Sequence, residues 1–573
     1  YSYIAYQDYR LNPEHPPLVK ALAGIPLVLQ NFKFPLDHPS WEGLNEQWAI
    51  GHAFFYESGN NPDAIFQWAR LGPMLLVLVL IFFIYIWGRE LFGKWWALLP
   101  ATLFGLSPSV LGHGHLVTTD IGSSLGVFAA LYFLIRYLDD TSPLATRHNL
   151  IMAGIAFGIA QLMKFSAVLL IPLFIFLVFV FYLWKRSSSL YQHKSFWGYT
   201  KALVTIFFIG YLIVYGAYAL VTFNYPAEKQ ASDTEKILST FGGGGDPSWQ
   251  SCGLKKDPRY DRLRCLANID IWMSDKPVLR PAAEYLLGVL MVIQRSAGGN
   301  AAYFMGEVSS NGWWYYFPTI FALKETIPAL IIILCGLLIG AWGMTKNIRA
   351  PRAMFHAFKN YLGTNFAEFA MISFVILYWV YSIRSNLNIG FRHLLPTLPL
   401  TYLLATGALK KIFANSPKVK RVVVGCLLIW AVGETLFVAP YFLSYYNQFA
   451  GGTEKGYLIS TDSNYDWGQD LKRLAAFVEK NNIQKIAVDY FGGGDPKWYM
   501  GEKAEGWWSA RGNPKDYGIE WLAISTNSLE GALAKLAPGQ PRKPEDEYHW
   551  LQNLRDPNSP DFRAGTSIFI FKL

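Results

Sequence analysis

The sequence is poor in charged residues. Only 16% of its 573 residues are Asp, Glu, Lys or Arg, whereas soluble proteins carry about a quarter. Hydrophobic residues make up 52% and aromatic residues 16%. This shortage argues against an ordinary soluble enzyme and favours an integral membrane protein. Because the mean hydropathy is only +0.20, we expect large polar segments beside the membrane spans.

Cysteine is also scarce, with four residues in the whole chain, which is too few for a disulfide-stabilised scaffold. Cys335 and Cys426 lie within apolar runs, whereas Cys252 and Cys265 share one polar segment. These last two could pair if the segment faces an oxidising compartment. We therefore predict a Cys252–Cys265 disulfide.

Internal repeats and nucleotide-binding motifs are missing too. The glycine clusters Gly242–Gly245 and Gly492–Gly494 do not fit the strand–loop–helix pattern that holds phosphates. The net charge of +9 could serve nucleic acid or anionic lipid. Because the basic residues lie between apolar runs, we expect membrane lipid as a partner and no nucleic acid.

Long apolar runs predict ten membrane-spanning helices, since the hydrocarbon core needs about 20 apolar residues as helix. The runs are 64–87, 95–112, 119–138, 149–163, 165–184, 200–223, 319–344, 361–383, 393–412 and 419–440. Only Lys164 divides 149–163 from 165–184, so one long broken helix is the alternative there.

The distribution of Lys and Arg predicts the orientation. Most of these residues in short loops fall in one set of loops, whereas the other set holds only Lys164, Arg384 and Arg392. The first set is therefore expected in the cytoplasm, which leaves the long polar segments outside. We expect a multi-pass protein of the plasma (inner) membrane with an extracytoplasmic C-terminal domain.

Three regions follow from this pattern. Residues 1–62 form a first outer loop, in which 13–30 suits an interfacial amphipathic helix. Residues 63–440 form the transmembrane bundle, which includes an outer loop at 224–318 with a similar helix at 281–294. Residues 441–573 form a small α/β domain, with a helix at 466–481 and strands at 485–491, 521–525 and 567–572.

Two polar clusters near the outer ends of the spans contain carboxylates. Glu14 and His15 precede a double proline, with Lys20 following; an ordinary helix start is the alternative. His113 and His115 precede Asp120, which begins a span. Asp120 could simply favour a helix N-terminus. With the two histidines it could instead hold a metal ion or a phosphate.

Two further clusters contain cations. Lys324 follows an aromatic run, Gly312–Pro318, that also suits an interfacial belt. A lysine in an apolar run is costly unless it snorkels or meets an anion. Arg392 and His393 begin another span, and Lys164 lies at the same face. A lipid phosphate is their natural partner, and simple snorkelling is the alternative.

Carboxylates and cations on one membrane face suit sugar transfer from a lipid phosphate. The departing phosphate needs its charge neutralised by Lys, Arg or a metal ion. The acceptor hydroxyl needs a carboxylate as its base.

Four motifs carry a resemblance to a known family. Arg10–Lys20, Gly312–Pro318, Gly390–Pro396 and Asp462–Leu471 resemble bacterial glycosyltransferases related to the protein O-mannosyltransferases, which form glycosyltransferase family 39 and have the GT-C fold. The likeness extends along nearly the whole chain. It implies an α-helical polytopic membrane protein with a polyprenyl- or dolichyl-phosphate sugar donor and, usually, inversion at the anomeric carbon.

The resemblance also implies positions for the family's acidic residues. The principal catalytic Asp belongs just before the stretch that corresponds to Tyr1–Tyr9, and Asp8 does not fit that position. We therefore expect the first span and this Asp to precede residue 1. Asp120 resembles the second acid, and Glu14 and His15 fall on the residue pair before the double proline.

The expected function is a hexosyltransferase that moves a mannose-like sugar from a polyprenyl-phosphate donor to a protein or glycolipid hydroxyl at the extracytoplasmic face. Its catalytic residues would be Glu14, His15 and Asp120, and its donor-phosphate ligands would be Lys20, Lys164, Lys324, Arg392 and His393. The cofactor is unknown, although His113, His115 and Asp120 could hold a divalent metal. A transporter or flippase of polyprenyl-linked glycan is the alternative, and a glycan receptor without catalysis is a third interpretation.

Overall fold

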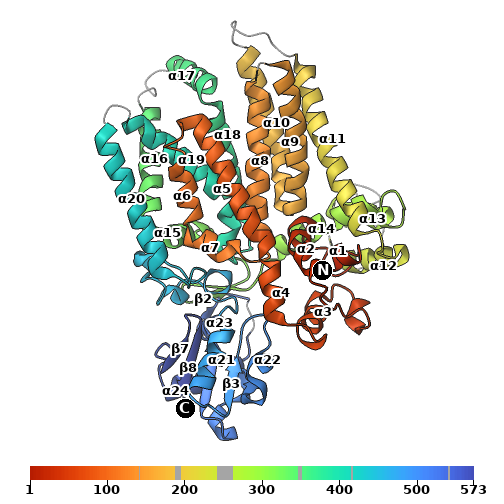
Figure 1. Ribbon diagram of the computed structural model, residues 1–573, viewed down its shortest axis with the longest axis vertical. Coiled ribbons are helices and arrows are strands. Elements are labelled where there is room, and N and C mark those ends of the chain that lie inside the picture. The colour runs from red at the N-terminus through yellow and green to blue at the C-terminus, as the bar shows by residue number, and fades with distance from the viewer. Residues whose placement is uncertain (141, 187–194, 242–261, 346–350, 414–416, 540–541) are drawn as a thin grey trace.

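The computed structural model has a helical bundle with a small α/β domain at one end (Figure 1). It describes residues 1–140, 142–186, 195–241, 262–345, 351–413, 417–539 and 542–573. The predicted fold class, a helical membrane bundle with a C-terminal α/β domain, is confirmed.

Five helical segments of the described chain are long and apolar enough to cross a membrane, and all five were expected from the sequence. They are 62–92, formed by α4 (Pro62–Ala69) and α5 (Leu71–Phe92); α8 (Thr119–Asp139); 165–185, formed by η3 (Phe165–Leu169) and α10 (Leu170–Arg186); α11 (Phe196–Val221); and α18 (Phe366–Arg384). Large apolar side chains such as Leu75, Leu78 and Phe82 of α5 are exposed on the bundle surface. Such side chains suit contact with lipid.

Two of the predicted spans, 95–112 and 319–344, are interrupted, so the prediction of a single helix was wrong for both, whereas 393–412 stays one continuous helical segment. The run 95–112 divides into α6 (Leu98–Gly105) and α7 (Pro108–Gly114), with Pro108 as the first helical residue. The run 319–344 divides into α15 (Tyr316–Lys324) and α16 (Ile327–Thr345). The run 393–412 starts as the 3-10 helix η6 (Phe391–Thr397) and continues as α19 (Leu398–Ile412). Hydropathy misses such breaks because the interrupting residues are themselves apolar or buried.

The uncertain pair of spans forms two separate helices. α9 (Pro143–Met163) ends where Lys164 adopts an extended conformation, with φ −159° and ψ 137°, and η3 and α10 follow. The chain turns back there, since the ring of Phe157 in α9 lies 5.9 Å from the ring of Phe174 in α10, so the interpretation of one long broken helix was wrong. α9 also packs closely on α8, because a Cβ added at Gly126 would lie 2.7 Å from the Cα of Ala160.

Two further helices belong to the bundle. They are α17 (Pro351–Thr364) and α20 (Pro417–Val438). At the end that carries the C-terminal domain lie the short α1 (Ser2–Ala5), α2 (Pro17–Leu29), α3 (Gln47–His52), α12 (Ala227–Leu238), α13 (Arg262–Ser274) and α14 (Arg280–Gly298). α2 and α14 correspond to the two helices predicted for the outer loops.

The cysteines can be compared only in part with the prediction. Cys265 in α13 is disulfide-bonded, and Cys335 and Cys426 are free thiols. Cys252, the predicted partner of Cys265, lies outside the described residues.

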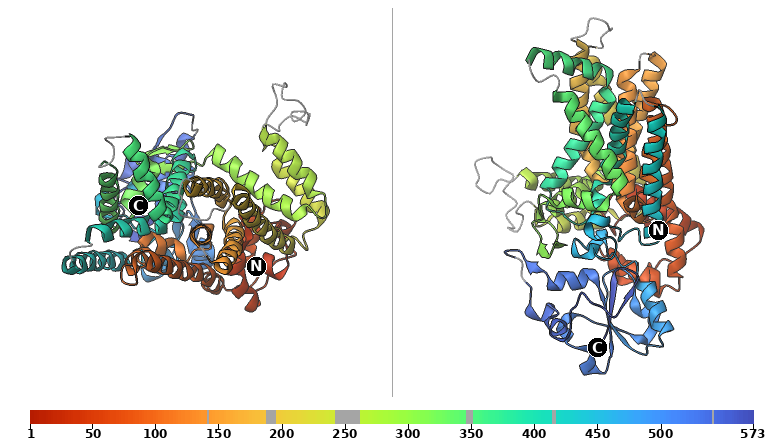
Figure 2. Two further views of the ribbon diagram at one scale, coloured as in Figure 1. Left: turned by 90° about the horizontal axis from the view of Figure 1, so that it is seen from above. Right: turned by 90° about the vertical axis from the view of Figure 1, so that its left-hand side faces the viewer.

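The C-terminal domain has a five-stranded sheet in the order β4-β3-β5-β8-β7. Its strands are β3 (Ile486–Asp489), β4 (Ala504–Gly506), β5 (Trp521–Ser525), β7 (Phe562–Ala564) and β8 (Ile568–Lys572), and β4, β3 and β5 are parallel. Its helices are α21 (Leu471–Lys480), α22 (Pro496–Met500), α23 (Thr526–Leu533) and α24 (His549–Leu554). Helices lie on both sides of the sheet (Figure 2).

A second, small sheet links the C-terminal domain to the outer loop. β1 (Ala302–Phe304) pairs antiparallel with β2 (Glu307–Ser309), and β2 pairs parallel with β6 (Lys535–Leu536). This sheet ties residues before α15 to residues after α23. It therefore helps to hold the C-terminal domain on the end of the bundle.

A buried carboxyl in the outer loop predicts how stability depends on pH. Glu284 in α14 is 1% exposed and accepts a 2.7 Å hydrogen bond from the Gln230 amide in α12. Burial raises the pKa of Glu284 from 4.5 to about 8, and the nearby Asp233 adds to this. Between these two values the folded protein holds a proton that the unfolded chain releases. The free energy of unfolding must therefore fall as the pH rises from 4.5 to about 8.

Glu284→Gln should reduce this pH dependence, because glutamine resembles the protonated carboxyl and can still accept the Gln230 hydrogen bond. We expect the variant to lose less thermal stability than the unaltered protein between pH 4.5 and about pH 8. Glu228→Gln, which changes an exposed carboxyl of α12, is the matched control and should leave the pH dependence unchanged. Equal pH dependence in all three proteins would contradict a protonated Glu284.

Candidate functional site

Asp120 forms the centre of a cluster of charged residues from three separate parts of the chain. Its carboxylate lies in the first turn of α8, where an anion favours the helix N-terminus, and it is 1% exposed. Oδ1 accepts a 2.6 Å hydrogen bond from Nζ of Lys164, at the turn between α9 and η3. Oδ2 lies 3.6 Å from Nη1 of Arg392, in η6. The fold thus gathers one carboxylate and two cations at one place.

Two histidines complete this Asp120 cluster, which we define as His113, Asp120, Lys164, Arg392 and His393. Within the described part of the chain, both ring nitrogens of His113, Nε2 of His393 and Oδ2 of Asp120 are buried without a hydrogen-bond partner. Buried polar atoms normally have partners. A polar ligand bound beside the two cations could supply the missing hydrogen-bond partners.

Trp467, in the C-terminal segment, contacts two residues of the cluster. The Arg392 guanidinium lies 4.6 Å from the ring centroid of Trp467, and the His113 ring lies 6.2 Å from the Trp467 ring, edge to face. Nε of Arg392 also donates to Oγ of Ser463, 3.2 Å away. The sequence suggested no site role for Ser463 or Trp467. Their only signal was their place in the Asp462–Leu471 motif.

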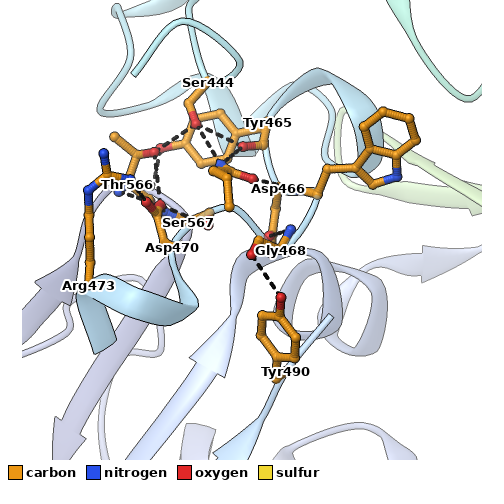
Figure 3. A network of polar contacts seen from close by, with 11 residues as sticks. Ser444, Tyr465, Asp466, Gly468, Asp470, Arg473, Tyr490, Thr566 and Ser567 are labelled. Carbon is orange, nitrogen blue, oxygen red and sulfur yellow. Dashed lines mark hydrogen bonds and ion pairs between the residues drawn. The ribbon is translucent and has the colours of Figure 1, made fainter. Parts of the chain in front are cut away.

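Two aspartates of that motif hold its loop on the C-terminal domain (Figure 3). Asp466 accepts hydrogen bonds from the backbone N–H groups of Gly468 (3.2 Å) and Asn527 (3.1 Å). Asp470 accepts from the N–H groups of Thr566 (3.0 Å) and Ser567 (2.9 Å). The helix expected at 466–481 begins only at Leu471, because residues 466–470 serve these contacts instead.

Glu14, His15 and Lys20 form a second cluster beside the first. Glu14 makes an ion pair with Arg295 of α14, a residue that the sequence did not indicate. Nζ of Lys20 donates to the Asn12 carbonyl and lies 3.4 Å from it. Burial lowers the pKa of His15 to about 4, with contributions from the charges of Lys20 and Lys164. His15 is therefore neutral at ordinary pH.

The hydrogen bonds of Lys324 go to residues outside both clusters. It is 1% exposed, donates a 2.8 Å hydrogen bond to the Leu443 carbonyl and another to the Asn464 carbonyl, and lies 4.8 Å from the ring centroid of Tyr446. These contacts bind α15 to the segment that leads into the C-terminal domain. They hold Lys324 in place by protein contacts, and its role as a phosphate ligand stays a prediction.

The described residues contain no group of three or more His, Cys, Asp or Glu side chains placed to hold a metal ion. His113, His115 and Asp120 do not form such a group, and Nδ1 of His115 is hydrogen-bonded to the Leu111 carbonyl, 2.9 Å away.

One family model matches part of the chain. Residues 63–214 match the family described as dolichyl-phosphate-mannose-protein mannosyltransferase. These residues include Asp120 and Lys164. The match confirms the resemblance to this family, although the four motifs that indicated it in the sequence lie outside residues 63–214. No curated protein matches the chain.

Several solved structures are similar to the chain at low identity. The oligosaccharyltransferase of Archaeoglobus fulgidus in the apo form is 13% identical with a TM-score of 0.43, over 91% of this chain and 63% of that one. ArnT from Cupriavidus metallidurans bound to undecaprenyl phosphate is 15% identical with a TM-score of 0.26, over 90% of this chain and 83% of that one. The chain thus spans less than two thirds of the length of the archaeal enzyme.

Proposed function

We propose that this chain is a membrane glycosyltransferase that moves one sugar from a polyprenyl-phosphate donor to a hydroxyl of a protein or glycolipid. The observation that carries the proposal is the buried Asp120 carboxylate between Lys164 and Arg392, at the end of the bundle that also bears the C-terminal domain. Buried charges at the ends of membrane spans are costly and usually functional.

The charge of the Asp120 cluster suits a lipid phosphate. Lys164 and Arg392 carry two positive charges against the single negative charge of Asp120. His113 is buried, and neither its ring nitrogens nor Nε2 of His393 has a hydrogen-bond partner among the described residues, so we count both histidines as neutral. The excess of one positive charge matches the single negative charge of a phosphodiester donor. Arg392 can offer a planar pair of N–H groups to the phosphate, and Lys164 can offer a point charge.

The same cations would assist the chemical step. The acceptor oxygen forms a bond with the anomeric carbon, the bond from that carbon to the phosphate oxygen breaks, and the electron pair leaves with the polyprenyl phosphate. The leaving group becomes a monoester with a second ionisation near a pKa of about 6. Cations fixed beside the phosphate stabilise the charge that develops there.

We assign the acceptor side of the site to Glu14 and His15. Their cluster lies beside the Asp120 cluster, because a Cβ added at Gly122, two residues after Asp120, would lie 2.6 Å from Cγ2 of Val19 in α2. Glu14 is an acid with access to solvent, since its side chain is 15% exposed. It is suited to accept a hydrogen bond or the proton from the acceptor hydroxyl, while Asp120 orients Lys164 and Arg392.

The identities of the substrates and the cell compartment belong to the same proposal. The family description over residues 63–214 supports a mannose-like hexose as the sugar. The Lys and Arg distribution supports a site on the extracytoplasmic face of the plasma membrane. Because Trp467 reaches Arg392, the C-terminal domain lies on the same face as the site and is placed to influence acceptor access.

Radiolabelled polyprenyl-phosphate mannose, incubated with the full chain in lipid nanodiscs and with a membrane extract as acceptor, tests this function. We expect label to leave the lipid and appear in a protein or glycolipid product, and chelator in a parallel reaction reports any need for divalent metal. Absence of transfer from every polyprenyl-phosphate sugar tested would contradict the proposal. Movement of labelled lipid across proteoliposomes without transfer would identify a flippase instead.

A further inference from the structure

The loop that carries Trp467 is fixed to the bundle immediately beside Arg392. The side-chain oxygen of Asn464 accepts a 2.8 Å hydrogen bond from the Phe391 N–H, and the Ser463 hydroxyl donates to the Ile389 carbonyl. Between them, a Cβ at Gly390 would lie 2.1 Å from the Ser463 hydroxyl oxygen. The contact therefore requires glycine at position 390, and it leaves the loop little freedom relative to η6.

The same loop is fixed to the C-terminal domain at its sheet. β3 and β5 are parallel neighbours, and the chain runs from β3 to β4 on the opposite side before it returns to β5. The carboxyl ends of strands at such a switch point usually bind a ligand. Here the Asp466 carboxylate lies at these strand ends and accepts a hydrogen bond from the Asn527 N–H at the start of α23. The Tyr490 hydroxyl, just after β3, donates a hydrogen bond to the Gly468 carbonyl, 2.7 Å away. Figure 3 shows the contact of Tyr490 with Gly468, with Asp466 beside it.

Trp467 thus lies between two anchored parts of one loop, with its ring against a cation of the Asp120 cluster. An arginine side chain in isolation can adopt many rotamers, and ordering it costs free energy. Stacking on an aromatic face restricts the guanidinium while leaving its N–H edge available to an anion. The side chain of Arg392 is 16% exposed, so its remaining freedom depends strongly on the groups that cover it.

We propose that Trp467 is a positioning residue for Arg392, through which the C-terminal domain sets the affinity of the bundle for a lipid phosphate. The inference rests on the proposed function, because it assumes that the Asp120 cluster binds the phosphate. Trp467 itself need not touch the phosphate. It holds the guanidinium next to Asp120, so that binding does not have to order this side chain.

Binding of undecaprenyl phosphate without sugar, measured for the full chain in phosphatidylcholine nanodiscs, tests the inference. Trp467→Ala should weaken binding by about 3- to 30-fold, the range of a partly buried cation–π contact. Trp467→Phe keeps an aromatic face and should retain most of the affinity. Trp508→Ala is the matched control, because Trp508 is an exposed tryptophan that also contacts an arginine, Arg511, within the C-terminal domain. It should bind like the unaltered protein.

A double-mutant cycle separates positioning from a general loss of structure. In an Arg392→Met background, Trp467→Ala should weaken binding no further, because the side chain on which it acts is gone. Equal weakening in both backgrounds, or normal binding by Trp467→Ala, would overturn the inference while leaving the lipid-phosphate site intact. Failure of the unaltered protein to bind the lipid would instead overturn the proposed function, and with it this inference. Thermal unfolding of each variant identifies any that do not fold. If Trp467→Ala does not fold, the affinity of Trp467→Phe is compared with that of the unaltered protein instead.

Discussion

Replacing Arg392 with alanine is expected to lower the rate of sugar transfer by about 100- to 1000-fold, the usual effect of removing a group that stabilises charge in the transition state. Arg392 lies 3.6 Å from Asp120 and against Trp467, and it supplies half of the positive charge in the Asp120 cluster. The charge on the departing phosphate would then rest on Lys164 alone. The measurement is the initial rate with saturating acceptor, from which kcat and KM for the donor are separated.

Two further variants show whether the loss belongs to Arg392 itself. Arg392→Lys retains the charge but lacks the planar pair of N–H groups, so we expect an intermediate rate. Arg384→Ala removes an exposed arginine at the end of α18 and should transfer sugar normally. Normal transfer by Arg392→Ala would show that the phosphate does not bind at the Asp120 cluster.

Replacing Asp120 with asparagine is expected both to abolish most of the transfer and to destabilise the protein. The side chains of Asp120, Lys164 and Arg392 are 1%, 16% and 16% exposed. Without the carboxylate, two largely buried cations would face each other with no anion. Breaking a buried ion pair in this way typically costs about 3–5 kcal/mol. The thermal unfolding temperature in nanodiscs and the transfer rate report the two effects separately.

Removal of one cation should restore the stability but not the activity. In the double variant Asp120→Asn with Lys164→Met, the unbalanced positive charge is reduced, so we expect the unfolding temperature to recover in part. Transfer should stay low, because the phosphate has lost Lys164. If Asp120→Asn alone kept both its stability and its activity, Asp120 would neither balance these cations nor serve the reaction.

The helical bundle and the C-terminal α/β domain could be predicted from the chain alone, because both depend on local patterns. A membrane span requires an apolar run of about 20 residues, and the runs around α5, α8, α10, α11 and α18 satisfy this requirement. The strands of the C-terminal domain follow from short stretches of β-branched and aromatic residues such as 568–572. The residue types of the site were also predictable, since a charge at the end of an apolar run stands out in the sequence.

The breaks in the helices could not be predicted in the same way. Hydropathy averages over a window, so it treats 319–344 as one run even though α15 ends at Lys324 and α16 begins at Ile327. The deciding interactions come from distant residues. Lys324 donates to the Leu443 and Asn464 carbonyls, and no local pattern around Lys324 indicates these partners.

The composition and order of residues thus determined that the chain folds as a membrane bundle with a C-terminal domain and that Asp120, Lys164 and Arg392 lie near the ends of spans. Only the tertiary structure decided that these three side chains meet, that Glu14 pairs with Arg295, and that Trp467 covers Arg392. The physical reason is the range of the interactions. Burial of an apolar run depends on the run itself, whereas a charged side chain has no preferred partner until packing brings distant segments within a few ångströms.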